Sequence, residues 1–326
     1  MFKKISLFAA AAITAISLTG CAPIGDATPN EVTVVTHDSA VFTKEVIAEF
    51  KKQTGITIKQ IKAGDTGAMT NKLVLTKDAP IADVVYGIDN TFMSVATENG
   101  IIDGDMSPVD FADVCLNYDK QWFATNEQPA PTSVKDLTKP AFKGLTVLTN
   151  PSTSSPGLAF LAATVELFGE NGWEQYWTAL KANDVKIAAG WEDAYFTEFS
   201  GSSGKGNYPI VLSYSSSPAF EVRDNGESQT ESLLDGCFRQ TEYVGVLKNA
   251  KNPAAAKKLA DFMLTEPFQK TLADSMYVYP MLKTIALPKE WAEFAPAATK
   301  TVGDTLEITA NRKAWLSKWS DIFAVN

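Results

Sequence analysis

The stretch from Asn150 to Thr164, "NPSTSSPGLAFLAAT", places four hydroxyl side chains and two prolines directly before a run of small apolar residues. Asn and Ser are good N-caps and Pro suits the first helical turn, so the stretch predicts a loop that enters a helix. One cap needs only one hydroxyl. The surplus hydroxyls, beside free N–H groups and the positive end of the helix dipole, favour a site for an anion or a polar ligand group. An over-provided cap on a surface loop is the alternative.

Aromatic residues gather at three turn-rich places, next to Ser, Gly and Pro. These residues are Trp191 and Tyr195 in "GWEDAY", Tyr214 and Phe220 in "SYSSSPAF", and Tyr277 and Tyr279 in "MYVYP". Each one alone is explained by core packing, but three such clusters together are not. Aromatic faces near carboxylates suit a flat, cationic ligand, which stacking and cation–π attraction would hold by about 0.5–2 kcal/mol per ring.

Signals for enzyme chemistry are weak. His37 is the only histidine, so every histidine-centred triad or metal site would have to use it. No G-x-S-x-G, Cys/His metal spacing or EF-hand pattern occurs. A serine hydrolase that uses Ser154 or Ser155 with His37 and an aspartate remains a remote alternative. Glu192 and Asp193 are interpreted as solvated charges. We therefore expect a protein that is not an enzyme, with no catalytic residue, no metal ligand and no cofactor.

The N-terminus has the pattern of an export signal. Two lysines precede an apolar run from Ile5 to Leu18, which is too short to span a bilayer, and "LTGC" follows. This ending resembles a bacterial lipobox, which implies a signal peptide over residues 1–20, lipid on Cys21 and a tether over residues 21–30. Ordinary cleavage that leaves Cys21 free is the alternative. We expect an exported protein, lipid-anchored to the outer face of the cell membrane or periplasmic.

Composition and length limit the kinds of binding partner and the number of lobes that we expect. The formal net charge is −9, and it becomes more negative when the signal peptide is removed, which argues against a nucleic-acid partner and favours a cation. A mature chain of roughly 300 residues exceeds the usual size of one core, so it predicts two lobes. In an oxidising compartment Cys115 and Cys237 are predicted to pair as a disulfide, with two buried thiols as the alternative.

The order of elements predicts an α/β fold. Strand-like runs at residues 31–36, 56–61 and 82–89 alternate with helical runs, which indicates a mainly parallel sheet flanked by helices. Ligands bind beyond the carboxyl ends of such strands. Those ends carry Thr36 to Ser39, Ala63 to Gly67 and Gly87 to Asn90.

Two further strand-like runs, which contain Cys115 and Cys237, bracket a second α/β unit and would let the chain leave the first lobe and return. We expect lobe 1 to comprise residues 31–114 and 240–326 and lobe 2 residues 115–239, with a ligand cleft between them. A long amphipathic helix is predicted over residues 254–274. The C-terminal run "NRKAWLSKWSDIF" is predicted to be a helix whose tryptophans pack in the core or between the lobes.

The motifs together resemble a known family. "KNPAAAKKLADFMLTEPFQ" is similar to the helix after the return crossover in two-lobed substrate-binding proteins of bacterial ABC importers. "VVTHDS", "ADVVYGIDN", "STSSPGL", "GWEDAY", "VLSYSSSPAF", "YVYP" and "RKAWLSKW" follow the order and spacing of the thiamine-binding members. The resemblance covers essentially the whole mature chain. It implies the type II periplasmic-binding-protein fold, thiamine or its mono- or diphosphate as ligand, delivery to an ABC permease, and a monomer.

The resemblance also implies roles for particular residues. Aromatic positions that stack on the ligand rings match Trp191, Tyr214 and Tyr277, with Phe220 nearby. An acidic position after the second strand matches Asp65, and the helix start that receives the hydroxyethyl or phosphate end matches Ser154 and Ser155. The full expected ligand-binding set is His37, Asp65, Asp89, Ser154, Ser155, Trp191, Tyr195, Tyr214, Phe220 and Tyr277.

Three positions depart from the family pattern. His37 and Phe220 stand where tyrosines are usual, and Tyr277 stands where tryptophan is usual. These changes put the affinity and the phosphate preference in doubt, and they keep iron(III) and polyamines as alternative ligands, since binders of both share the architecture. Iron binders usually offer an adjacent tyrosine pair, whereas Tyr277 and Tyr279 would face opposite ways on a strand.

Overall fold

The computed structural model describes residues 30–202, 205–303 and 306–324. The predicted signal peptide, Cys21 and all but the last residue of the predicted tether lie outside these ranges. Within them, no helix combines the length and the apolar character that crossing a membrane requires.

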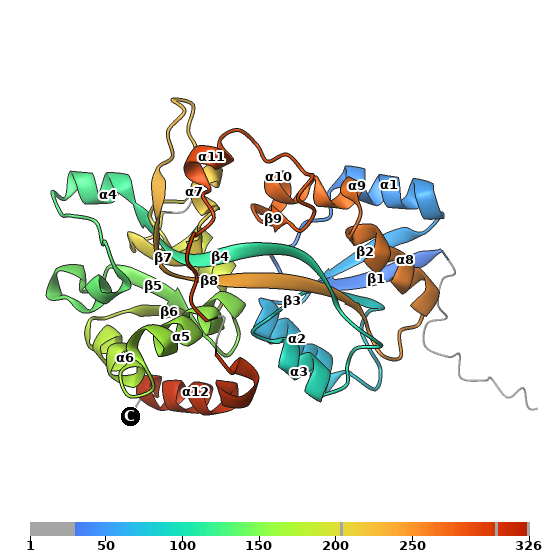
Figure 1. Cartoon of the computed structure of the whole chain (residues 1–326), viewed down its shortest axis with the longest axis horizontal. Helices are drawn as coiled ribbons and strands as arrows, with labels where there is room; N and C mark the ends of the chain where they lie inside the picture. The colour runs from blue at the N-terminus through green and yellow to red at the C-terminus, as the bar shows by residue number, and fades with distance from the viewer. Residues whose placement is uncertain (1–29, 203–204, 304–305, 325–326) are drawn as a thin grey trace, which may run out of the picture.

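A mixed sheet of nine strands runs through the whole molecule (Figure 1). Its strand order is β2-β1-β3-β8-β4-β7-β5-β6, and β9 pairs with β4. The strands are β1 (Glu31–Thr36), β2 (Thr57–Lys62), β3 (Val84–Asp89), β4 (Ser107–Asp119), β5 (Thr146–Thr149), β6 (Lys186–Ala188), β7 (Ile210–Tyr214), β8 (Thr230–Val246) and β9 (Tyr279–Pro280). The first three strands are parallel to one another, and β5 is parallel to both β6 and β7. The predicted two-lobed α/β architecture with mainly parallel sheets is confirmed.

Helices cover both faces of each lobe. Those packed around β1 to β3 are α1 (Lys44–Thr54), α2 (Thr66–Leu75), α3 (Met93–Glu98) and α8 (Pro253–Met263). Those around β5 to β7 include α5 (Ser155–Phe168) and α6 (Trp173–Ala182), and the short π-helix η3 (Asp193–Glu198). The remaining helices are α4 (Lys120–Thr125), η1 (Val134–Thr138), η2 (Pro140–Phe142), α7 (Ser217–Phe220), α9 (Glu266–Gln269), α10 (Leu272–Met276), α11 (Trp291–Phe294) and α12 (Ile308–Phe323).

Local chemistry sets the ends of these elements. The Thr43 hydroxyl accepts a hydrogen bond from Val46 N–H and starts α1, and Gly55 ends it in the left-handed region with φ 74°. All six residues of β3 are buried, as expected for a central strand covered on both faces.

The strands β4 and β8 are the long connection between the lobes (Figure 1). They pair antiparallel from Ser107↔Val244 to Asp119↔Thr230, so each one contributes to both lobes. Cys115 on β4 and Cys237 on β8 form a disulfide with a Cα–Cα distance of 4.6 Å. The predicted pairing of these two cysteines on the two bracketing strands is confirmed.

The predicted long helix over residues 254–274 is wrong. The chain forms three separate helices there, because α8 ends at Met263 and α9 begins anew with Pro267 in its first turn. Proline lacks the N–H that a continuous helix would need and clashes with the preceding turn. The apolar spacing is helical on both sides, which made the run look continuous.

The C-terminal helix is confirmed, with both of its tryptophans buried. It packs against α6, where Trp319 and Trp177 meet edge to face at 5.9 Å. Since α6 lies in the range expected for lobe 2, this packing differs from the predicted grouping of residues 240–326 with lobe 1. The exact lobe boundaries stay a prediction.

We expect the disulfide to contribute substantially to stability. Its loop spans 122 positions, for which a chain-entropy model gives about 4–5 kcal/mol. We therefore expect the double variant Cys115→Ser, Cys237→Ser to have a free energy of unfolding that is lower by on the order of 2–5 kcal/mol. Urea unfolding of the protein without its signal peptide and Cys21 measures this difference. Dithiothreitol should lower the wild-type midpoint and leave that of the double variant unchanged. Equal urea midpoints for the wild-type protein and the double variant in the absence of dithiothreitol would contradict this stabilising role.

Candidate ligand-binding site

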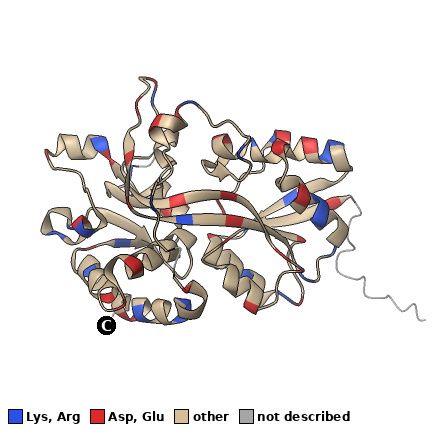
Figure 2. Cartoon of the chain, viewed as in Figure 1, with Lys and Arg blue, Asp and Glu red and all other residues tan. Residues whose placement is uncertain are grey.

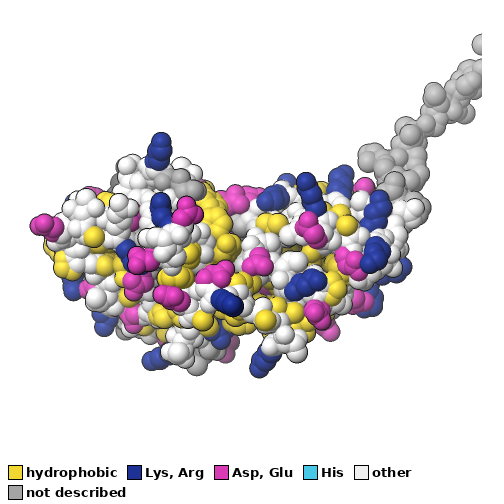
Figure 3. Space-filling view, turned by 90° about the horizontal axis from the view of Figure 1, so that it is seen from above, with side chains coloured by type: hydrophobic (Ala, Val, Ile, Leu, Met, Phe, Trp, Pro, Cys, Tyr) yellow, Lys and Arg dark blue, Asp and Glu magenta, His cyan; other side chains and the backbone are white. Residues whose placement is uncertain are grey.

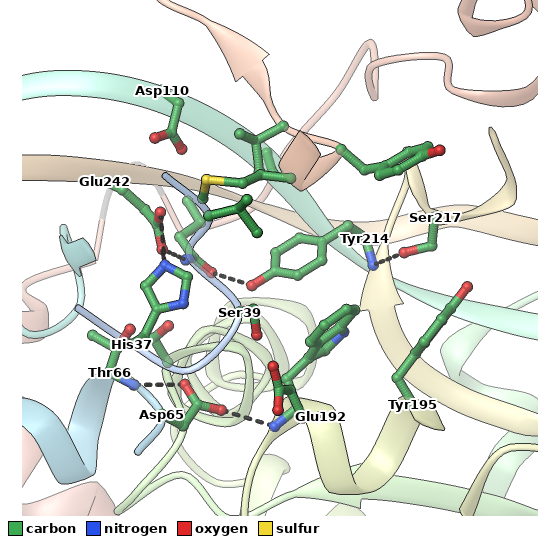
Figure 4. Close-up of a pocket in the computed structure, with 18 of the residues that line it drawn as sticks. His37, Ser39, Asp65, Thr66, Asp110, Glu192, Tyr195, Tyr214, Ser217 and Glu242 are labelled. Atoms are coloured by element: carbon green, nitrogen blue, oxygen red, sulfur yellow. Dashed lines mark hydrogen bonds and ion pairs between the residues drawn. The ribbon is translucent and has the colours of Figure 1, made fainter. Parts of the chain in front are cut away.

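A cavity of about 240 Å³ lies between the lobes, and both lobes contribute to its wall. Most of the predicted ligand-binding residues line it, namely His37, Asp65, Ser155, Trp191, Tyr195, Tyr214, Phe220 and Tyr277. In the space-filling view, hydrophobic side chains gather where one lobe borders the hollow between the two (Figure 3). The close-up shows the lining side chains pointing toward one another from both lobes (Figure 4).

The carboxyl ends of β1 and β2 place two of these residues. His37 directly follows β1, and Asp65 follows β2 as the N-cap of α2. The His37 ring lies against Gly87 of β3, where a Cβ atom would come within 2.2 Å of the ring. Gly87 also has φ 99°, so a side chain at this position would both strain the backbone and displace the histidine.

Asp65 connects the two sides of the cavity. Its carboxylate accepts hydrogen bonds from Thr66 N–H at 2.6 Å and, across the cavity, from Trp191 N–H at 2.8 Å. The Ser154 hydroxyl lies beside this carboxylate and lowers its pKa slightly, although it makes no hydrogen bond within the described structure. Burial has the larger effect and raises the pKa of Asp65 above its ordinary value.

A chain of hydroxyl groups holds the Trp191 ring. The indole Nε1–H donates to Ser213 Oγ at 2.9 Å, and the hydroxyls of Ser213 and Ser217 are 2.7 Å apart. Ser217 Oγ also accepts from Tyr214 N–H at 3.2 Å. Trp191 stacks on Tyr195 with ring centroids 5.0 Å apart. The indole therefore has a fixed orientation before a ligand arrives.

Phe220 and Tyr277 extend this aromatic group along the cavity, since Phe196 contacts both Trp191 and Phe220. The rings of Phe220 and Tyr277 meet edge to face at 4.9 Å, and Tyr277 has the left-handed φ of 56°, which is uncommon for a bulky residue. The Tyr277 carbonyl accepts a hydrogen bond from Ser216 Oγ at 2.5 Å, which helps to hold this conformation.

A buried ion pair stands at the inner wall. His37 Nε2 lies 3.3 Å from the carboxylate of Glu242, and both side chains are almost fully buried. Burial alone would lower the pKa of His37, but the charge of Glu242 and its hydrogen bond outweigh burial and raise that pKa to about 9. The histidine is thus a cation at neutral pH.

A further acid, Asp110, lines the cavity behind this pair. Tyr86 donates its hydroxyl to Asp110 Oδ2 at 2.5 Å, while Oδ1 has no hydrogen-bond partner among the described groups. Burial, followed by the negative charge of Glu242, raises the pKa of Asp110 well above its ordinary value. This shift favours the uncharged, protonated form of Asp110 over the carboxylate.

Two predicted residues do not line the cavity. Asp89 is fully buried at the end of β3, where its carboxylate accepts hydrogen bonds from the Thr91 hydroxyl and from Phe92 N–H. Burial raises its pKa to about 7. Ser154 is also fully buried and is the N-cap residue of α5, whereas Ser155 faces the cavity. The placement of Asp89 and Ser154 lends no support to direct ligand contacts.

The long strands supply polar residues that the sequence pattern did not predict for the site. Asp110 on β4 and Gln240 and Glu242 on β8 all line the cavity, and acidic residues are visible midway along both strands in Figure 2. Gln240 and Glu242 are two positions apart and so share a face of β8, which was the available signal. Glu192, interpreted as a solvated charge, is exposed but borders the cavity.

The charges around the cavity favour a cationic ligand. Its lining includes the acids Asp65, Glu192 and Glu242, against the cations His37 and Lys62, and Asp110, whose raised pKa favours the uncharged form. The aromatic faces add attraction for a flat cation. In the part of the chain that the structure describes, no cluster of three His, Cys, Asp or Glu side chains forms a metal site.

Two alternative chemistries have little geometric basis. His37 Nε2 faces Glu242, and among the described residues no hydrogen bond joins His37 to Ser154 or Ser155, as a hydrolytic triad would need. Tyr277 lines the cavity, but Tyr279 turns away and donates its hydroxyl to the Ala295 carbonyl, so the two tyrosines do not converge on one ion.

The protonation of His37 can be measured directly, because the chain has only one histidine. We expect the imidazole NMR signals of the untagged protein to titrate with a midpoint near pH 9. Since this pKa is raised above the unfolded value of about 6.5, the pair stabilises the fold fully below that pH and loses its effect as pH rises through 9.

In Glu242→Gln, burial loses the largest of the charges that oppose it, while Asp65 remains, so the His37 midpoint should fall well below the wild-type value. A wild-type midpoint near pH 6.5 would contradict the ion pair.

Comparisons with known proteins agree with this geometry. Residues 79–298 match the family described as bacterial extracellular solute-binding protein. The "Thiamine-binding periplasmic protein" of Salmonella typhimurium is 28% identical over 311 residues, which cover 88% of this chain and 92% of the relative.

Solved structures share the fold. A structure described as "Periplasmic thiamin binding protein" matches with a TM-score of 0.80 and 24% identity, covering 94% of this chain and 100% of the other. Iron-bound HitA from Pseudomonas aeruginosa matches with a TM-score of 0.70 and 21% identity, covering 91% and 100%. With a family match over well over half of its length and a ligand-sized cavity between two lobes, this chain belongs to the bacterial extracellular solute-binding proteins.

Proposed function

We propose that this protein binds thiamine outside the cytoplasm and delivers it to an ABC permease. The observation that carries the proposal is the cavity itself, where the oriented Trp191 ring and the Tyr214 ring lie opposite buried carboxylates. Thiamine has two flat rings and a permanent positive charge, so it satisfies both the aromatic faces and the acidic lining. The name of the Salmonella typhimurium relative supports the same ligand.

Binding and release would follow from the contacts between the lobes. Asp65 of one lobe and Trp191 of the other are joined directly by a hydrogen bond of 2.8 Å, and Ala68 N–H donates to the Thr153 carbonyl nearby. A ligand that bridges the two walls adds to these few contacts and favours the closed form, while the long β4 and β8 connection permits opening. We further propose that the protein acts as a monomer, without a catalytic residue, metal or cofactor, and that lipid on Cys21 anchors it to the membrane.

The start of α5 would receive the hydroxyethyl end of thiamine. Ser155 is the hydroxyl that lines the cavity at this point, and the positive end of a 14-residue helix lies behind it. The Asp65 carboxylate, however, stands beside the same helix start and opposes a second negative group. We therefore rank free thiamine above its mono- and diphosphate.

A polyamine is the competing cationic ligand. Acidic lining alone would suit it, but a flexible aliphatic chain gains less than a ring system from Trp191, Tyr195 and Tyr214. Calorimetric titration with thiamine, its phosphates, spermidine and ferric citrate distinguishes these ligands. Binding of spermidine or iron without binding of thiamine would overturn the proposed function.

We expect Trp191→Ala to weaken thiamine and its phosphates alike. Loss of the desolvated stacking face should cost on the order of 1–3 kcal/mol of binding free energy, or roughly 5- to 150-fold in Kd. Trp122→Ala on α4 is a matched control, because Trp122 lies outside the cavity lining. Thermal unfolding of both variants checks that the fold is intact. A thiamine Kd in Trp191→Ala equal to the wild-type value would remove the indole from the site.

We expect Ser155→Ala to weaken thiamine monophosphate more than thiamine, by about 1–2 kcal/mol, because the hydroxyl can donate to a phosphate oxygen. Ser154→Ala, one residue earlier, is the control, since its hydroxyl does not line the cavity. Calorimetry with both ligands measures the difference. Equal losses for the two ligands in Ser155→Ala would place the ligand tail elsewhere and leave this stretch as an ordinary helix start.

A further inference from the structure

Glu242 is a buried carboxylate with unused hydrogen-bonding capacity at the cavity wall. Its side chain is 7% exposed, and it lines the cavity from β8. Its contacts with His37 Nε2 and Gln240 Nε2 are all 3.3 Å long. Hydrogen bonds to a charged carboxylate are usually about 2.7–2.9 Å long, and a carboxylate has about four acceptor positions. Both oxygens can therefore accept more than the protein supplies.

The neighbouring acids single out Glu242. In the sheet register it lies between Asp89 on β3 and Asp110 on β4. Like charges opposite one another on adjacent strands are unfavourable, and burial together with Glu242 raises the pKa of both flanking acids. Glu242 is the member of this row that pairs with the cationic His37. It is also a member that faces the cavity, whereas Asp89 does not.

An aromatic face stands next to this carboxylate. The Tyr214 hydroxyl is 3.5 Å from Gln240 Oε1, and Gln240 Nε2 is 3.3 Å from Glu242. Figure 4 shows the Tyr214 ring directed toward the side of the cavity where Glu242 and His37 lie. A flat ring stacked on Tyr214 would thus present its edge to an amide and a carboxylate. That combination suits an aromatic ring with an N–H donor on its edge.

We propose that Glu242 determines specificity by accepting a hydrogen bond from the exocyclic amino group of the ligand's aminopyrimidine ring, an inference that rests on the proposed function. Asp65, which the family resemblance places in contact with the ligand, already accepts short hydrogen bonds from the N–H groups of Thr66 at 2.6 Å and Trp191 at 2.8 Å, which hold the two walls together.

The test compares two ligands that differ at that amino group. Oxythiamine carries an oxygen in place of the exocyclic amine and keeps the positive thiazolium. Wild-type protein should bind thiamine at least about tenfold more tightly than oxythiamine, because a buried acceptor loses its donor. In Glu242→Gln the thiamine Kd should rise at least about tenfold while oxythiamine changes little, so the preference collapses. The exposed Glu231 lies on the same strand, and Glu231→Gln should leave both values unchanged.

The ratio of the two affinities distinguishes recognition from a general effect on the fold. Equal losses for both ligands in Glu242→Gln, or no loss for either, would overturn the inference. If Glu242→Gln does not fold, Glu242→Asp retracts the carboxylate while it keeps the charge beside His37, and the same collapse of the ratio is expected. Wild-type protein that binds neither ligand would instead refute the proposed function.

Discussion

The antiparallel pairing of β4 and β8 is the interaction on which the cavity depends. Each strand extends through both lobes, and the disulfide between Cys115 and Cys237 fixes them near the middle of their length. The same two strands present Asp110, Gln240 and Glu242 to the ligand space. Structural connection and ligand recognition therefore share one element, so a one-residue slip of β8 would move both Gln240 and Glu242 to the opposite face.

Placing charges in this connection has an energetic cost, which the local arrangement offsets. A buried carboxylate without a partner would be strongly unfavourable, and His37 supplies the countercharge for Glu242. The penalty is smaller for Asp110, because its raised pKa favours the uncharged form and Tyr86 donates a hydrogen bond to it. The part of the wall that these three side chains form therefore pairs its charges but retains free acceptor positions. Such a wall attracts donors more than it attracts charge in general, which favours selectivity over simple electrostatic capture.

Local sequence rules predicted the parts of the site that lie at the ends of secondary structure. His37 and Asp65 follow strands, Trp191 stands at the start of a short helical segment, and Tyr277 is the C-cap of α10. Gly, Pro and Ser residues near such ends made these positions recognisable in the sequence. Glu242 escaped because it lies in the middle of a strand, where an acid is ordinarily a solvent-facing residue. Only the pairing of β8 with both β3 and β4 makes that face an interior one, and such pairing is not local information.

The divided helix and the packing of α12 have the same origin. Pro267 is a local signal that separates α8 from α9. The prediction of one long helix gave more weight to the helical spacing of apolar residues on both sides of this proline. For α12, chain order placed it in lobe 1, whereas the partner of Trp319 is Trp177 of α6. The packing of Trp319 on Trp177 determines where α12 lies, and the spacing of residues within α12 does not predict that contact.

The start of α5 depends both on its local sequence and on its tertiary surroundings. Its hydroxyl-rich sequence predicted a polar site, and α5 does begin at the cavity, but the fold turns Ser154 inward beside Asp65 and leaves Ser155 on the lining. A carboxylate thus already occupies the region of positive potential that an anion would otherwise take. The Asp65 carboxylate also accepts the hydrogen bond from Trp191 N–H that joins the two walls. A ligand phosphate that displaced this carboxylate would therefore weaken the contact between the walls. For this reason a neutral hydroxyl suits the start of α5 better than a phosphate does.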